Sequence, residues 1–203
     1  MQVEYFFDCS SPWTYLSFAH IESLCDARDA ELVWKPILVG GVFNTVNPSV
    51  YAARGNPVPV KARYSAKDLQ DWARLRGIRI GSPPVFPVNS VKAMRGAFVA
   101  LEAGCISAYT RAVFERYWGE LDDISQDSVM SDIAAGVGLD PDAFMAEIGT
   151  DARKSALRRN TDELIERGGF GSPTMFLDGT DMYFGNDRLV LLDAAMAARS
   201  ATA

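Results

Sequence analysis

The sequence has few of the residues that build metal centres and disulfide frameworks. Its 203 residues include one histidine, His20, and three cysteines, Cys9, Cys25 and Cys105, which lie far apart. No Cys-x-x-Cys pair and no cysteine–histidine spacing typical of zinc occurs, so we expect no metal. An odd number of scattered cysteines suits a reducing compartment better than a disulfide framework, and we therefore expect a cytoplasmic protein.

Long apolar runs and an excess of positive charge are also missing. No apolar stretch approaches the roughly 18 residues of a membrane span, and residues 1–8 are typical of a strand rather than of a secretion signal. The net charge of -6 argues against nucleic acid as a main partner. We interpret local basic patches as a solvated helix face, for example Arg153, Lys154, Arg158 and Arg159.

The chain begins with a strand–helix–strand unit. Residues 3–8 and 31–35 are rich in aromatic and β-branched side chains and predict buried strands. Between them, Ser11 and Pro12 are typical of an N-cap and a first helical position, so we expect a helix from residue 12 to about 27. Such a unit is the usual start of an α/β sheet.

The remainder of the chain has a helical middle and a mixed end. Residues 44–59 hold several Pro, Gly and Asn residues and predict a loop with short turns. Helical periodicity then predicts helices over 66–76, 90–103, 106–118, 125–137, 141–147 and 151–167. The chain returns to two strands and a last helix, over 174–177, 182–184 and 188–198.

This order predicts an α/β sheet that is interrupted in sequence by an all-helical domain. The sheet would be formed by residues 1–45 and 150–203, and the insertion would span residues 46–149. A chain of this size buries roughly 70% of its unfolded surface, so the fold needs no disulfide or metal to be stable.

The first candidate for chemistry is the link between the first strand and the first helix. Helix N-termini present free N–H groups and the positive end of the helix dipole, so they stabilise anions. A thiolate held at Ser11 would have a lowered pKa, and the Ser11 hydroxyl could donate a hydrogen bond to it. The alternative is that Ser11 only caps the helix, since serine is a common N-cap.

The second candidate is the segment over residues 169–174, directly before an apolar strand. Pro173, at the entry of an internal strand, lacks a ladder donor and is a candidate cis-proline. Ser172 would then offer free backbone groups to an extended peptide. The alternative is an ordinary loop proline.

Together, these two segments resemble those of a known family. Bacterial DsbA-type oxidoreductases place Cys-Pro-x-Cys at a helix start and a cis-proline opposite it; here Ser11-Pro12-Trp13-Thr14 has hydroxyl residues in place of both cysteines. This version is similar to kappa-class glutathione transferases and 2-hydroxychromene-2-carboxylate isomerases. Further blocks resemble that family in the same order, at residues 40–43, 56–64, 68–73, 86–90 with Arg95, 117–118, 123–125, 170–174 and 184–189.

The resemblance implies a thioredoxin-like fold interrupted by an inserted all-helical domain, with glutathione as the cofactor. The glutathione thiol would lie at Ser11, the catalytic residue, and Ser172 with cis Pro173 would pair with the cysteinyl part. The remaining contacts implied are Asn56 and Lys61 at the glycyl end, and Asn186 and Asp187 at the γ-glutamyl end.

The resemblance also implies the reaction. It is the interconversion of 2-hydroxychromene-2-carboxylate and trans-o-hydroxybenzylidenepyruvate, or a related aromatic intermediate, through a glutathione thiolate adduct. A small aromatic substrate, a part in aromatic compound degradation and a homodimer are implied with it. The candidate substrate pocket consists of Trp13, Phe43, Tyr64, Trp72, Phe86 and Asn89. His20 lies more than two helical turns after Ser11, so we expect a structural role for it.

Two other functions remain open on the sequence alone. A kappa-like glutathione transferase or peroxidase would use the same site with a different acceptor pocket. A non-catalytic glutathione-binding module could use the same contacts without turnover. A dithiol oxidoreductase is nearly excluded, because Ser11 and Thr14 stand where the cysteines would be.

Overall fold

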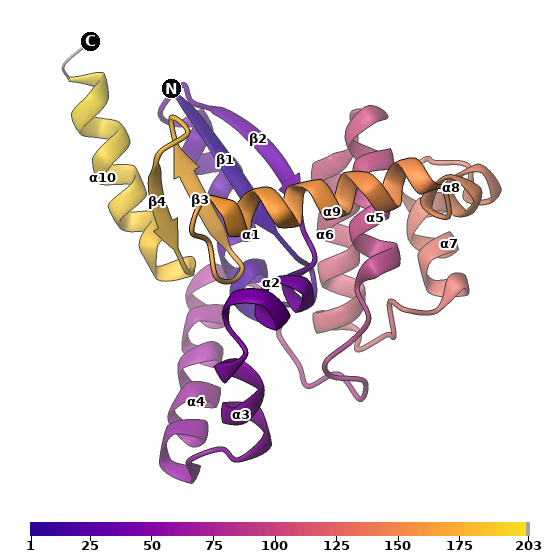
Figure 1. The fold of residues 1–203 in the computed structure, drawn as a ribbon, viewed down its shortest axis with the longest axis horizontal. Helices are drawn as coiled ribbons and strands as arrows, with labels where there is room; N and C mark the ends of the chain where they lie inside the picture. Colours follow the sequence, from indigo (N-terminus) through magenta and orange to yellow (C-terminus); the bar gives the residue numbers. More distant parts are fainter. Residues whose placement is uncertain (202–203) are drawn as a thin grey trace.

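The computed structural model describes residues 1–201 and is built around one mixed β-sheet (Figure 1). Its strands are β1 (Gln2–Phe7), β2 (Glu31–Pro36), β3 (Thr174–Leu177) and β4 (Asp181–Phe184). They lie in the order β2-β1-β3-β4. β1 pairs with β2 in parallel, whereas β3 pairs antiparallel with both β1 and β4. The strands predicted at both ends of the chain are therefore confirmed, and they form a single sheet.

Helices cover the sheet and form a second region beside it (Figure 1). The helices are α1 (Pro12–Asp26), α2 (Val39–Val46), α3 (Ser49–Gly55), α4 (Pro59–Arg76), α5 (Val91–Glu102), α6 (Ile106–Phe114), the π-helical turn η1 (Glu115–Gly119), α7 (Asp127–Gly136), α8 (Pro141–Ile148), α9 (Asp151–Glu166), the 3-10 turn η2 (Asn186–Arg188) and α10 (Leu189–Ser200). In Figure 1, α9 crosses in front of the sheet, α5 to α8 gather to its right, and α3 and α4 extend below it. The α/β fold with inserted helices is confirmed, whereas the insertion boundaries at residues 46 and 149 stay a prediction. Within residues 1–201, no helix combines the length and the apolar character that a membrane crossing needs.

The prediction of a loop over residues 44–59 is wrong. These residues include the end of α2, all of α3 and the start of α4, which begins at Pro59 rather than at residue 66. The Asn and Pro residues that suggested a loop stand at helix ends instead, such as Asn56 after α3 and Pro59 at the first position of α4. α2 and α3 have only eight and seven residues, too few for a clear period, and α2 is held by the burial of Val42.

The central strand β1 is buried on both faces of the sheet. Val3, Tyr5 and Phe7 belong to the larger core, which includes residues of α1, α10 and the inserted helices. Phe6 belongs to a smaller core with Phe176 of β3 and with residues of α2 and α9. Because both faces are packed, the position of β1 is fixed, and so is the turn that follows it into α1.

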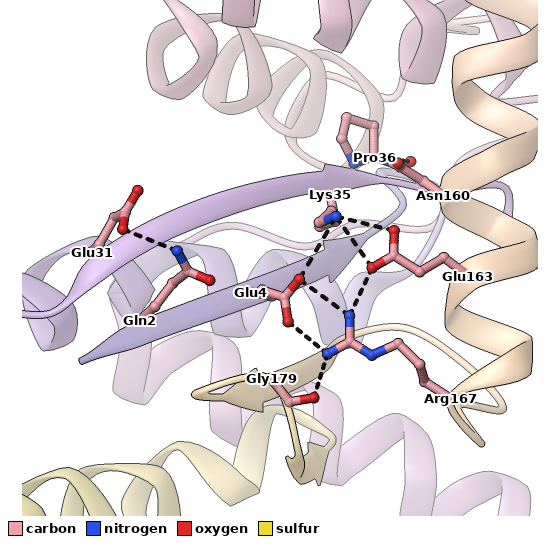
Figure 2. Close-up of polar contacts among 9 residues, drawn as sticks. All are labelled: Gln2, Glu4, Glu31, Lys35, Pro36, Asn160, Glu163, Arg167 and Gly179. Carbon is pink, nitrogen blue, oxygen red and sulfur yellow. Dashed lines mark hydrogen bonds and ion pairs between the residues drawn. The ribbon is translucent and has the colours of Figure 1, made fainter.

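A network of charged side chains links β1 and β2 to the residue that follows α9 (Figure 2). Arg167 donates hydrogen bonds of 2.6 and 3.1 Å to the Glu4 carboxylate, and its guanidinium carbon lies 3.9 Å from the centroid of the Phe176 ring. Lys35 Nζ lies 3.0 Å from Glu163 Oε2 and 3.7 Å from Glu4 Oε1. The hydrogen bonds from Arg167 lower the pKa of Glu4. The network therefore attaches the C-terminal end of α9 to the middle of the sheet.

Glu4→Gln should lower the free energy of unfolding by about 2 kcal/mol at pH 7. The reason is that the substitution replaces the charged acceptor of the Arg167 hydrogen bonds by a neutral amide in a largely buried place. The folded-state pKa of Glu4 is lowered, so its contribution is present above the unfolded-state pKa and is lost as the pH falls through the folded-state pKa. Urea unfolding should therefore show a smaller difference between wild type and variant at pH 3 than at pH 7.

Asp162→Asn is the matched control, because it weakens the exposed pair between Arg158 and Asp162 on α9. It should change the free energy of unfolding by less than about 0.5 kcal/mol. An equal loss for Glu4→Gln at both pH values would contradict the role of the ionised Glu4 carboxylate.

Candidate active site

Ser11 lies at the N-terminus of α1, as the sequence predicted. Its backbone is extended, with φ -101° and ψ 122°, and its hydroxyl oxygen accepts a hydrogen bond of 3.2 Å from the Thr14 N–H. Pro12 is the first helical residue. The Ser11 hydroxyl also donates to the backbone carbonyl of Ser172, at 3.2 Å. The two segments that the sequence singled out are therefore in direct contact.

The peptide bond between Ser172 and Pro173 is cis, which confirms the predicted cis-proline. The Ser172 side chain holds this loop against the start of α1. Its hydroxyl oxygen accepts from the Asp8 N–H at 3.0 Å and lies 2.8 Å from Thr14 Oγ1. Within residues 1–201 the Ser172 backbone N–H donates no hydrogen bond, so it is available to a ligand.

Asp8, which sequence analysis did not select, lies buried beneath the site. One of its carboxylate oxygens accepts from the Ser10 N–H at 2.9 Å, and the other accepts from the Val39 N–H at 2.8 Å and the Ser90 hydroxyl at 3.1 Å. Burial raises the pKa of Asp8, and these hydrogen bonds oppose the rise. One side chain thus joins the segments that follow β1 and β2 to the start of α5.

A cavity of about 830 Å³ lies in front of these loops. Six residues predicted for the site or the substrate pocket line it: Ser11, Trp13, Phe43, Phe86, Asn89 and Ser172. It is also lined by polar and aromatic residues and one charged residue that were not selected, among them Asn44, Asn47, Tyr51, Arg54 and Phe184. Several of these belong to α2 and α3, so the expectation of a loop there concealed them. A second cis peptide bond, between Phe86 and Pro87, was also not foreseen.

Four predicted residues lie outside the cavity lining: Asn56 directly after α3, and Lys61, Tyr64 and Trp72 on α4. Asn56 and Lys61 are exposed, and Tyr64 is 67% exposed. Trp72 packs partly buried against the core, and the guanidinium carbon of Arg76 lies 5.5 Å from its ring centroid. The structure therefore does not bring these residues together with Ser11, and their contacts with glutathione or substrate remain a prediction.

Asn186 and Asp187 lie on the other side of the cis-proline loop. The Gly185 N–H donates to the Pro173 carbonyl at 3.1 Å, and η2 packs against α1. Asn186 is buried, and its Nδ2 has no hydrogen-bond partner in the described chain. Asp187 pairs with Arg188 at 2.5 Å. Neither residue lines the cavity, so their role at the γ-glutamyl end also stays a prediction.

The cysteine nearest to the site in sequence is poorly suited to react. Cys9 is 1% exposed, and burial raises the pKa of its thiol well above the ordinary value. Its N–H donates to the Met94 sulfur, and its carbonyl accepts from the Trp118 ring N–H at 2.9 Å. His20 lies outside the cavity lining as well. Within residues 1–201, no group of three or more His, Cys, Asp or Glu side chains could hold a metal ion.

The sheet order, the capped helix and the cis-proline opposite it define a thioredoxin-like protein with hydroxyl residues at both positions of the usual dithiol. Comparison with known proteins supports the assignment to the thioredoxin-like class. A family model described as a DSBA-like thioredoxin domain matches residues 2–197. The chain belongs to this family and, within it, to the 2-hydroxychromene-2-carboxylate isomerases, which are isomerase enzymes.

Three relatives carry this assignment. A 2-hydroxychromene-2-carboxylate isomerase of Pseudomonas putida is 33% identical over 201 residues, covering 97% of this chain and 94% of that protein. A solved structure of such an isomerase has a TM-score of 0.83 and 30% identity, and the alignment covers 98% of this chain and 96% of that one. Glutathione S-transferase kappa 1 of Rattus norvegicus is 28% identical, covering 94% of this chain and 88% of that protein.

Asp8→Asn should change how stability depends on pH. The raised folded-state pKa of Asp8 makes a stability contribution that is present below the unfolded-state pKa and is lost as the pH rises through the folded-state pKa. The asparagine side chain does not titrate, so it makes no such pH-dependent contribution. Its amide NH2 group would face at least one hydrogen-bond donor, which lowers the free energy of unfolding by roughly 1–3 kcal/mol at every pH. Urea unfolding between pH 4 and pH 8 should show the variant's deficit narrowing as the pH rises. A constant deficit would contradict the raised pKa.

Proposed function

We propose that the chain is a glutathione-dependent isomerase that interconverts 2-hydroxychromene-2-carboxylate and trans-o-hydroxybenzylidenepyruvate. The observation that carries the proposal is Ser11, a hydroxyl at a helix N-terminus in a cavity of about 830 Å³, in a chain 33% identical to such an isomerase. A cavity of this size is within the usual range for small-molecule sites. We keep the expectations of a cytoplasmic location, a homodimer and a part in aromatic compound degradation as elements of the same proposal.

The residues present fit glutathione in two respects. A peptide ligand needs backbone partners, and Ser172 has a backbone N–H without a partner at the cavity wall. A polar ligand satisfies buried donors, and Asn186 Nδ2 is a buried donor without an acceptor beside the same loop. Ser172 would thus hold the cysteinyl part, and Ser11 would face its sulfur. The kinship with a kappa-class glutathione transferase supports the same cofactor.

When bound, glutathione would supply a sulfur nucleophile for reversible addition to the conjugated carbon, which would allow rotation about the former double bond once the C–O bond of the chromene ring has opened. The protein's part is to hold that sulfur as an anion. The N–H groups at the start of α1 and the Ser11 hydroxyl both favour negative charge at this point. To donate a hydrogen bond to the sulfur, the Ser11 hydroxyl would give up the hydrogen bond that it now donates to the Ser172 carbonyl.

The second candidate is a kappa-like glutathione transferase. It is favoured by the 28% identity to the rat enzyme, and it would use Ser11 in the same way. The two candidates differ in whether glutathione is returned unchanged or is consumed by an electrophile.

The full chain should convert 2-hydroxychromene-2-carboxylate rapidly when glutathione is added, and slowly or not at all without it. Absorbance spectroscopy follows the reaction, and a thiol assay at the end point should find all the glutathione returned. Loss of thiol in step with loss of a test electrophile, such as 1-chloro-2,4-dinitrobenzene, with no conversion of the chromene, would refute the isomerase and favour the transferase.

Ser11→Ala should lower kcat about a hundredfold and change the Kd of glutathione much less, because the hydroxyl acts on the charged sulfur. The substitution also removes an N-cap, at a cost of about 1 kcal/mol of stability. Ser11→Thr keeps the cap and the hydroxyl and should restore most of kcat. Ser23→Ala makes the same change at the other end of α1 and should leave kcat unaltered. Calorimetric titration and steady-state rates give both readouts, and unchanged turnover in Ser11→Ala would remove Ser11 from the mechanism.

A further inference from the structure

One positively charged side chain lines the cavity, and it has no acidic partner in the described part of the chain. Among the described residues that line the cavity, Arg54 on α3 is the only one with a formal charge. Within residues 1–201 it forms no ion pair and donates no hydrogen bond to the protein. Its side chain is exposed, so it meets no steep desolvation cost, and its charge is free for a ligand.

Two aromatic rings hold Arg54 at the cavity wall. Its guanidinium carbon lies 5.6 Å from the centroid of the Phe43 ring and 5.3 Å from that of the Phe86 ring. Both distances are within the range of a cation–π contact, which contributes about 0.5–1 kcal/mol at exposed sites. Phe43 belongs to α2 and Phe86 to the segment before α5, so Arg54 joins the two sides of the cavity.

This arrangement positions the guanidinium without using its hydrogen-bond donors. A phenyl ring attracts the cation but accepts no conventional hydrogen bond, and none of the five N–H groups of Arg54 has an acceptor within residues 1–201. A planar guanidinium with free N–H groups matches a carboxylate, which it can bind through two parallel hydrogen bonds. The aromatic rings beside it offer an apolar surface to the remainder of such a ligand.

We infer that Arg54 binds the carboxylate of an aromatic carboxylic acid in this cavity and so determines the substrate class. The reaction of this ligand rests on the proposed function, whereas the binding of its carboxylate by Arg54 does not. The carboxylate belongs to the substrate rather than to glutathione, because the aromatic rings of Phe43 and Phe86 beside the cation complement an aromatic ligand. Glutathione has no aromatic group, and its sulfur is expected at Ser11.

The test compares two ligands of nearly equal shape, trans-cinnamate and its neutral amide, trans-cinnamamide. Calorimetric titration of the full chain, without glutathione, measures binding of each. Wild type should bind cinnamate about tenfold more tightly than the amide. Arg54→Met, which keeps an unbranched apolar stem but no charge, should lose this preference, whereas Arg54→Lys should keep part of it. Arg63→Met is the matched control on α4, away from the cavity lining, and should behave as wild type.

The outcomes separate this inference from the proposed function. Loss of the preference in Arg54→Met supports the inference even if the chain shows no isomerase turnover, a result that would refute only the proposed function. In an active enzyme, Arg54→Met should also raise the KM for the chromene substrate about tenfold and leave the Kd of glutathione within twofold. A wild type without preference for cinnamate, or an Arg54→Met variant that retains it, would overturn the inference. Weaker glutathione binding with an unchanged cinnamate preference would overturn it too, because Arg54 would then bind the tripeptide.

Discussion

The antiparallel pairing of β1 with β3 brings together two segments that lie 161 residues apart at their point of contact. Phe6 pairs with Thr174, so the residues that follow β1 and those that precede β3 meet at the same edge of the sheet. Ser11 and Ser172 reach hydrogen-bond distance as a consequence. A register shift of one residue would turn every buried side chain of β1 to the opposite face, and the two cores therefore fix this pairing.

A few polar side chains connect this pair of strands to the other segments that form the site. Asp8 directly follows β1, and its carboxylate reaches the Val39 N–H after β2 and the Ser90 hydroxyl before α5. On the other side, Arg167 binds Glu4 and so holds the end of α9 and the loop that leads to Ser172 (Figure 2). The cavity walls thus come from distant parts of the chain, yet each wall is attached to β1. A site built in this way is precise because its supports are buried.

The parts of this structure that the sequence predicted are those with local causes. The cap at Ser11, the cis bond before Pro173 and the strands at both ends depend on a few neighbouring residues, and all are confirmed. The parts that it missed depend on tertiary packing. α2 and α3 are too short for a clear period, so Arg54 had no predicted place, and Asp8 looked like the end of an ordinary strand. Tyr64 was assigned to the substrate pocket by resemblance, and no local pattern indicated that it is 67% exposed.

The charges in the cavity bear on the chemistry that we propose. A thiolate and a substrate carboxylate are both negative, and two like charges in one cavity repel each other. In our proposal the protein contributes one positive feature for each of them: the N-terminus of α1 would face the sulfur, and Arg54, which lines the cavity, would face the carboxylate. Asp8 lies buried beneath the site, where burial raises the pKa of its carboxyl group and the hydrogen bonds that it accepts oppose the rise. In the proposed reaction the negative charge would move from the sulfur to the conjugated carbonyl oxygen of the substrate on addition, and would return to the sulfur on elimination. The N-terminus of α1 would therefore stabilise the negative charge before the sulfur adds and again after the carbon–sulfur bond breaks, whereas Arg54 would bind the substrate carboxylate throughout.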